Sequence, residues 1–133
     1  MAALLGRAER DLTVRIRAAL EEEGCAVECW HALALLADGA GHPMAELAGH
    51  GLLSPPTLTR LIDSMVADNL VYRKADERDR RRVLVFATRR GRALHHRIAT
   101  RIERQLDDIL PSDLSRADLE RLSALLHALT TPG

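Results

Sequence analysis

The sequence predicts a mainly α-helical protein with one small β-hairpin, and two observations carry this prediction. Apolar residues recur every three or four positions in several separate segments, which is the spacing of helices with one buried face. Two short runs rich in β-branched and aromatic residues, 70–74 and 83–87, flank the charged stretch ADERDRRR. With 133 residues and 47% hydrophobic content, the chain is expected to form a single domain, residues 1–133.

Two helices are expected before a glycine-rich turn. Residues 2–23 carry apolar side chains near helical spacing without a proline, and Gly24 ends this helix. Residues 27–38 form a second helix, with Trp30 on its apolar face. The sequence DGAGHP at 38–43 is rich in turn-forming residues and predicts a turn or short loop.

Two closely spaced helices and the hairpin follow. Residues 44–50 make a short helix, and Ser54 before two prolines caps the start of another that ends near Asp68. The apolar residues of this second helix have the spacing of one buried face: Leu58, Leu61, Ile62, Met65 and Val66. Short helices followed by a hairpin are the arrangement of a winged helix-turn-helix, which we place at residues 27–88.

Two further helices complete the chain. Thr88 is expected to cap a helix over residues 89–109, Pro111 breaks it, and Asp113 or Ser115 starts the last helix. The apolar stripes of the first and the last two helices exceed what a small winged domain needs for its own core. Residues 1–23 and 89–133 are therefore expected to form a helical dimerisation region.

Charge is distributed unevenly along this neutral chain. Residues 73–104 contain 12 basic and 4 acidic side chains, a net charge of +8, so the rest of the chain carries −8. Such a separation favours a polyanionic partner, although a solvated arginine-rich face is the plainer alternative. Only three aromatic residues are present, which argues against single-strand binding by base stacking. Together with the winged arrangement, the charge predicts binding to double-stranded DNA.

The predicted DNA contacts lie on the second helix of the helix-turn-helix pair and on the hairpin loop. Thr57, Arg60 and Ser64 share its outward face, where they suit base edges and phosphates in a major groove. The arginines of the loop, or wing, suit the backbone and an adjacent minor groove. The full predicted set is Ser54, Thr57, Thr59, Arg60, Ser64, Arg78, Asp79, Arg80, Arg81 and Arg82.

Several motifs resemble those of the multiple-antibiotic-resistance regulator (MarR) family. They are LA (47–48), SPPTLTRLID (54–63), NLV (69–71), DERDRR (76–81) and ATRRG (87–91). The resemblance covers roughly residues 24–95 and implies a homodimer whose first and last helices interlock. It also implies that two winged domains read a pseudo-palindromic operator. Many members of the family are repressors that are released by phenolic or other anionic ligands, by cysteine oxidation or by metal.

The resemblance assigns roles to two wing residues. Asp79 and Arg81 occupy the family positions at which an arginine enters the minor groove and an aspartate orients it, and a charge-assisted hydrogen bond would serve this purpose. A salt bridge within the wing that makes no DNA contact is the alternative. The chain departs from the family pattern at Gly51 and Leu52, which stand in reverse order, and at Asn69, which replaces glycine. Asparagine tolerates the left-handed conformation that a helix end often needs.

A regulatory ligand is expected between the winged domain and the dimerisation helices. Trp30 offers an apolar plane, His31 a titratable group and Ile16 an apolar wall, which suits a small aromatic anion. The alternative is that Trp30 is part of the core and His31 lies at the surface.

Other functions are weighed against this one. Cys25 and Cys29 would support a thiol-responsive regulator, although inert cysteines are the plainer interpretation. Zinc-responsive members of the resembled family place a histidine near the position of His31, but their histidine pair in the fifth helix falls further along than His95 and His96, so the resemblance disfavours zinc sensing. A winged protein-interaction module remains an alternative, whereas no catalytic motif, cofactor or metal site is predicted. The chain lacks a signal peptide and a membrane-length apolar run, so a cytoplasmic location is expected.

Overall fold

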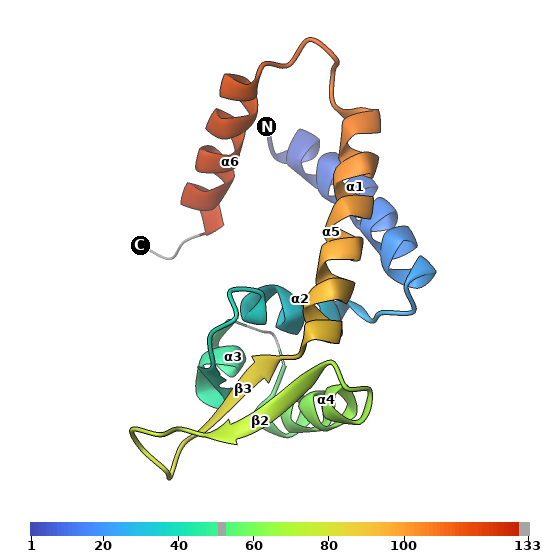
Figure 1. The fold of residues 1–133 in the computed structure, drawn as a ribbon. Coiled ribbons are helices and arrows are strands. Elements are labelled where there is room, and N and C mark those ends of the chain that lie inside the picture. The colour runs from blue at the N-terminus through green and yellow to red at the C-terminus, as the bar shows by residue number, and fades with distance from the viewer. Residues whose placement is uncertain (51–52, 131–133) are drawn as a thin grey trace. The chain divides into compact units, whose positions relative to one another are not determined.

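The computed structural model describes residues 1–50 and 53–130 (Figure 1). In these residues it contains six helices and a three-stranded antiparallel sheet, which confirms the predicted mainly α-helical class with a small hairpin. The elements are α1 (Ala2–Glu22), α2 (Val27–Leu36), β1 (His42–Pro43), α3 (Met44–His50), α4 (Pro55–Ala67), β2 (Val71–Ala75), β3 (Val83–Ala87), α5 (Arg89–Ile109) and α6 (Arg116–Thr130). The chain divides into two compact units, Met1–Ile102 and Glu103–Gly133.

The segment predicted as a turn or loop at 38–43 contains a strand that the sequence did not reveal. β1 pairs antiparallel with β3, with His42 opposite Val85, so that β3 lies in the middle of the sheet. Two residues are too few to show an alternating pattern, and β1 forms only because β3 offers a free edge. Gly41 permits this approach, since a Cβ there would lie 2.4 Å from the ring of Phe86. Gly39, at φ +79°, follows α2, which ends two residues earlier than expected.

The core of the first unit joins α2 and α4 to the sheet and to the start of α5. Its most deeply buried large side chains are Leu20, Leu33, Leu36, Ile62, Met65, Val71, Val85 and Ile98. Leu58, Ile62 and Met65 fix the inward face of α4, as predicted. The prediction for Val66 is wrong, because it lies at the margin of this face and is 38% exposed.

Short hydrogen bonds connect the end of α4 to the start of α5. Asn69 has a φ of 59°, so it adopts the left-handed conformation expected of it. The Thr88 hydroxyl donates to the Asn69 carbonyl at 2.7 Å and accepts from the Gly91 amide at 3.0 Å, which confirms Thr88 as a cap. Ser54 occupies the capping position of α4, but its hydroxyl contacts the Thr57 hydroxyl at 2.9 Å and makes no cap hydrogen bond. The prediction of a side-chain cap at Ser54 is therefore wrong.

The second unit contains the end of α5 and all of α6. The Ser115 hydroxyl accepts from the Asp118 amide, while the Asp118 carboxylate accepts from the Ser115 amide, so Ser115 begins this helix. α6 has no buried residue and exposes a set of leucines: Leu119, Leu122, Leu125, Leu126 and Leu129. Gly51 and Leu52, at the predicted departure from the family pattern, lie outside the described residues. Every helix in the described part of the chain is too short or too polar to span a membrane.

Candidate nucleic-acid interface

α4 presents a polar outer face opposite its buried one. Thr57, Arg60 and Ser64 are exposed there. Thr59 is exposed as well, and its hydroxyl donates to the Pro55 carbonyl at 3.0 Å. The three-residue and four-residue steps of the helix keep the polar side chains together while the apolar ones face the core. α4 is the helix predicted to read bases in the major groove, and we call it the reading helix. It thus presents an accessible row of hydrogen-bond donors.

Two carboxylates shape the backbone of the wing loop. Asp76 Oδ1 accepts from the Arg78 amide at 2.9 Å, and Asp79 Oδ1 accepts from the Arg81 amide at 3.2 Å. Backbone hydrogen bonds from Asp76 to the Arg82 carbonyl, at 2.8 Å, and from Arg82 to the Asp79 carbonyl, at 2.9 Å, close the loop. The loop therefore has a defined conformation, although nearly all its side chains are exposed.

The arginine side chains of the wing have few internal partners. The Arg81 side chain is 98% exposed, and its Nε lies 3.9 Å from Asp79 Oδ1, beyond hydrogen-bond distance. Arg82 Nε lies 3.6 Å from Asp76 Oδ2, and Arg78 and Arg80 are exposed. Asp79 thus holds the backbone amide of Arg81 in this structure, and the predicted hydrogen bond to its guanidinium is not formed. Exposed ion pairs of this length are weak, which leaves the guanidinium groups available to a partner.

An ion pair that the sequence analysis missed links the wing to the reading helix. Arg73 in β2 donates to Asp63 in α4 at 2.6 Å, across ten residues of sequence. Arg73 lies on the same face of β2 as the buried Val71, whereas Tyr72 points to the other face of the hairpin, where its ring stacks on Phe86. The strand therefore directs Arg73 toward α4. The contact fixes the reading helix relative to the hairpin.

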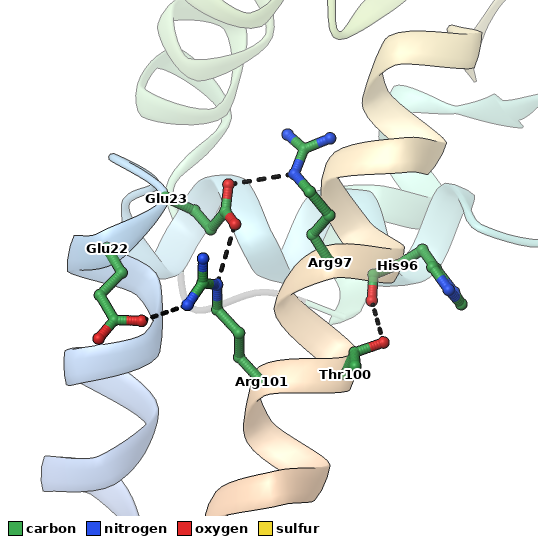
Figure 2. Close-up of polar contacts among 6 residues, drawn as sticks. All are labelled: Glu22, Glu23, His96, Arg97, Thr100 and Arg101. Carbon is green, nitrogen blue, oxygen red and sulfur yellow. Dashed lines mark hydrogen bonds and ion pairs between the residues drawn. The ribbon is translucent and has the colours of Figure 1, made fainter.

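Two arginines of α5 are paired with the end of α1, as Figure 2 shows. Glu23 accepts from Arg101 at 3.0 Å and from Arg97 at 3.2 Å, and Glu22 accepts from Arg101 at 2.5 Å. The hydrogen bonds from Arg101 and then Arg97 lower the pKa of Glu23, whose side chain is 12% exposed. These arginines counted toward the positive segment in the sequence, yet they serve to join two helices. No local sequence pattern predicts this pairing, because the partners are more than 70 residues apart.

The predicted ligand residues Trp30 and His31 are neighbours in space, with ring centroids 5.3 Å apart. Trp30 and Ile16 are half-buried and pack against the core, whereas His31 is exposed. Within the described residues, Trp30 Nε1 is buried and has no hydrogen-bond acceptor. A buried donor without a partner is costly, so this indole is a suitable point for an oxygen atom of a ligand.

The two cysteines are free thiols that contact one another. A hydrogen bond between them lowers the pKa of Cys25 and raises that of Cys29. Both thiols are half-buried at the junction between α1 and α2. Among the described residues, no three His, Cys, Asp or Glu side chains gather closely enough to hold a metal ion.

Comparisons with known proteins agree with this geometry. The sequence matches the MarR family over residues 28–83, which contain the helix-turn-helix pair and most of the hairpin. The homoprotocatechuate degradative operon repressor of Escherichia coli is 27% identical over 104 residues, covering 78% of this chain and 70% of that protein.

Solved structures match nearly the whole chain. The crystal structure of NadR in complex with 4-hydroxyphenylacetate is 26% identical, covers 97% of this chain and 91% of its own, and has a TM-score of 0.81. A mutant of MepR from S. aureus bound to an oligodeoxyribonucleotide is 24% identical, covers 96% and 94%, and has a TM-score of 0.70. The chain therefore matches the MarR family model over residues 28–83, and over nearly its whole length it shares the fold of these regulators.

Proposed function

We propose that this protein is a transcriptional repressor that binds a pseudo-palindromic DNA operator as a homodimer and responds to a small ligand. One observation carries the proposal: the first unit presents both an exposed polar face on α4 and an exposed, backbone-ordered arginine loop. A helix of this kind fits the major groove, and a basic loop fits the flanking minor groove. The match of residues 28–83 to the MarR family model and the repressor among the similar proteins support the same function.

The operator can be identified by selecting bound DNA from a random library and then measuring affinity at rising salt. Each phosphate that an arginine neutralises contributes about −0.9 to the slope of log affinity against log salt. We expect a sequence of two inverted half-sites and a steep negative slope. A failure to enrich any sequence, with little salt dependence, would instead support a winged protein-interaction module.

Homodimer formation is supported by the apolar side chains that this chain exposes. The leucines of α6 have helical spacing and are open to solvent, as are Leu4, Leu5 and Val14 of α1. A set of this kind is what an obligate interface covers. Leu126→Asp should give a monomer in light scattering and lose operator binding, because a dimer must place two reading helices one DNA turn apart. Ala124→Asp, at an exposed site on the opposite side of α6 from the leucines, is the matched control and should remain a dimer.

The effector is expected to be a small aromatic anion that contacts Trp30, His31 and Ile16. NadR was solved with 4-hydroxyphenylacetate, which has this chemistry, and the Trp30 indole offers a buried donor without an acceptor. A ligand changes DNA affinity only if it prefers one arrangement of the two winged domains, with a typical coupling of about 1–3 kcal/mol. Salicylate and 4-hydroxyphenylacetate should weaken operator binding by the parent and less so by Trp30→Ala or His31→Ala.

Oxidation is a second route of release, and the hydrogen bond between Cys25 and Cys29 favours it. The lowered pKa of Cys25 makes it the nucleophile. It would attack an organic hydroperoxide, releasing an alcohol, and the resulting sulfenic acid would condense with Cys29 to a disulfide and water. If hydroperoxide weakens operator binding in the parent but not in Cys25→Ser, while aromatic acids have no effect, the thiol route replaces the ligand route.

A further inference from the structure

His42 is held between two carboxylates near the helix-turn-helix pair. Its Nδ1 lies 2.7 Å from Glu46 Oε1, and its Nε2 lies 2.9 Å from Asp38 Oδ2. A carboxylate accepts hydrogen bonds and donates none, so both ring nitrogens must carry a proton to satisfy these contacts. The His42 side chain is 16% exposed, whereas the carboxylates of Asp38 and Glu46 are about half exposed. The geometry is therefore that of an imidazolium with a carboxylate at each nitrogen.

These contacts connect three parts of the first unit. Asp38 follows α2, and its Oδ1 also accepts from the Ala40 amide at 2.9 Å, which orients the carboxylate. His42 is in β1, opposite Val85 of β3, the strand that continues from the wing loop. Glu46 is in the first turn of α3, the first helix of the helix-turn-helix pair. His42 thus connects α3 and the end of α2 to β1, the edge strand of the three-stranded sheet that carries the wing loop, which we call the wing sheet.

We propose that His42 is a positioning residue of the DNA interface, whose protonated ring fixes α3 against the wing sheet and so supports operator binding. The inference rests on the proposed function and adds a pH-dependent element to it. His42 itself is directed at Asp38 and Glu46, so it acts through the placement of α3 and the wing. We call the two hydrogen bonds from His42 to Asp38 and Glu46 the His42 tether. DNA binds the arrangement of α3 and the sheet in which this tether is formed better, and loss of the tether lowers the population of that arrangement.

The direction of the pH effect follows from the groups around the ring. Hydrogen bonds to Asp38 and then Glu46 raise the pKa of His42 above its ordinary value of 6.5, although partial burial opposes this. β3 carries no ionisable side chain, and Asp38, whose pKa is lowered mainly by His42, stays charged. A raised pKa means that the tether is complete below pH 6.5 and is lost as pH rises through the pKa of the folded protein. The imidazolium loses one proton when it becomes neutral, so one ring nitrogen of His42 then faces a carboxylate without a hydrogen between them.

The test is operator affinity of the 133-residue chain from about pH 6 to pH 9, a range that begins near the ordinary pKa of histidine and extends upward because the pKa of His42 is raised. We expect the parent to lose roughly threefold to tenfold in affinity over this range, as for the loss of one ordinary hydrogen bond. His42→Gln should bind weakly with a flat profile. Glu46→Gln removes one carboxylate and should move the decrease to lower pH. His96→Gln, at an exposed histidine of α5, is the control and should keep the parent profile.

Salt dependence separates positioning from direct contact. His42→Gln should keep the parent slope, because His42 neutralises no phosphate; a slope reduced by about 0.9 would make it a phosphate contact and overturn the proposal. A parent-like pH profile in His42→Gln would overturn it as well. Circular dichroism at each pH checks folding, and if His42→Gln does not fold, the shift in Glu46→Gln decides. If the parent binds no operator at any pH, the proposed function fails too, whereas binding without a His42-dependent profile refutes this inference alone.

Discussion

The arginines of the wing and those of α5 lie in one positive segment of the sequence, but the structure uses them differently. Arg81 is almost fully exposed, and its nearest carboxylate oxygen is 3.9 Å away. Arg97 and Arg101 donate to Glu23 at 3.2 Å and 3.0 Å, and Arg101 also pairs with Glu22. The wing arginines remain available to a polyanion, whereas Arg97 and Arg101 of α5 already have their counter-charges within the protein.

This difference teaches that a charge count locates a binding surface only approximately. The net charge of +8 over residues 73–104 overstates what DNA can meet, because Glu22 and Glu23 lie outside that segment. In the wing, the carboxylates of Asp76 and Asp79 accept hydrogen bonds from backbone amides. They organise the loop while leaving the guanidinium groups exposed. The pairing of Arg97 and Arg101 therefore reduces the positive charge that α5 can offer to DNA, whereas the wing loop keeps its exposed guanidinium groups.

The largest expected difference in operator affinity is between two variants, each of which replaces one arginine by alanine, in the wing or in α5. Arg81→Ala should weaken operator binding by about 1–3 kcal/mol and reduce the salt slope by about one, because a DNA contact is lost. Arg101→Ala should leave the salt slope unchanged, because its charge is paired with Glu22 and Glu23. Affinity titrations at several salt concentrations measure both quantities. Equal slopes for the two variants would remove the distinction between the regions.

The reading helix offers a contrast within the DNA interface. Arg60→Ala should change which bases are selected from a random library, because the exposed Arg60 is placed to meet base edges. A lost bidentate contact costs about 1–3 kcal/mol of discrimination at that position. Arg81→Ala, at the wing, should leave the selected major-groove bases unchanged. An unaltered sequence preference together with lower affinity would make Arg60 a phosphate contact.

Asp79 tests whether the wing carboxylates act on the backbone. Asp79→Ala removes the acceptor of the Arg81 amide and should cost about 0.5–1.5 kcal/mol of operator affinity by loosening the loop. Asp79→Asn keeps a side-chain oxygen, so it should recover most of that loss. If Asp79→Asn loses as much operator affinity as Asp79→Ala, the negative charge of the carboxylate is required. Orientation of the Arg81 guanidinium on DNA then becomes the better explanation for the role of Asp79.

The smallest expected effect concerns pH and the α1–α5 pairs. Because Arg101 and Arg97 lower the pKa of Glu23, the pairs stabilise the fold fully above its ordinary pKa of 4.5. This stabilisation is lost as pH falls through the pKa of the folded protein. The difference in Tm between the parent and Glu23→Gln should thus shrink on acidification, as thermal unfolding at a series of pH values would show. Glu28→Gln, at an exposed site of α2, should show no such trend.

The sequence by itself determined the elements whose signals are local. Apolar spacing located the buried face of α4, Thr88 and Ser115 marked helix starts, and the two β-branched runs predicted the hairpin. These signals depend on neighbours within a few residues, where backbone geometry decides which side chains share a face. The candidate DNA-binding residues of α4 could be predicted by the same local reasoning, because the outward face of a helix follows once its inward face is known.

Tertiary structure alone decided what depends on residues distant in sequence. β1 is a strand because β3 offers a free edge, and Arg73 meets Asp63 because the hairpin packs on α4. Arg101 is joined to Glu23 across 78 residues of sequence. In each case the contact is set by packing of the core, which brings together groups whose spacing in the sequence carries no information. That is why the sequence located the positive charge, while only the fold showed which part of it is free to bind DNA.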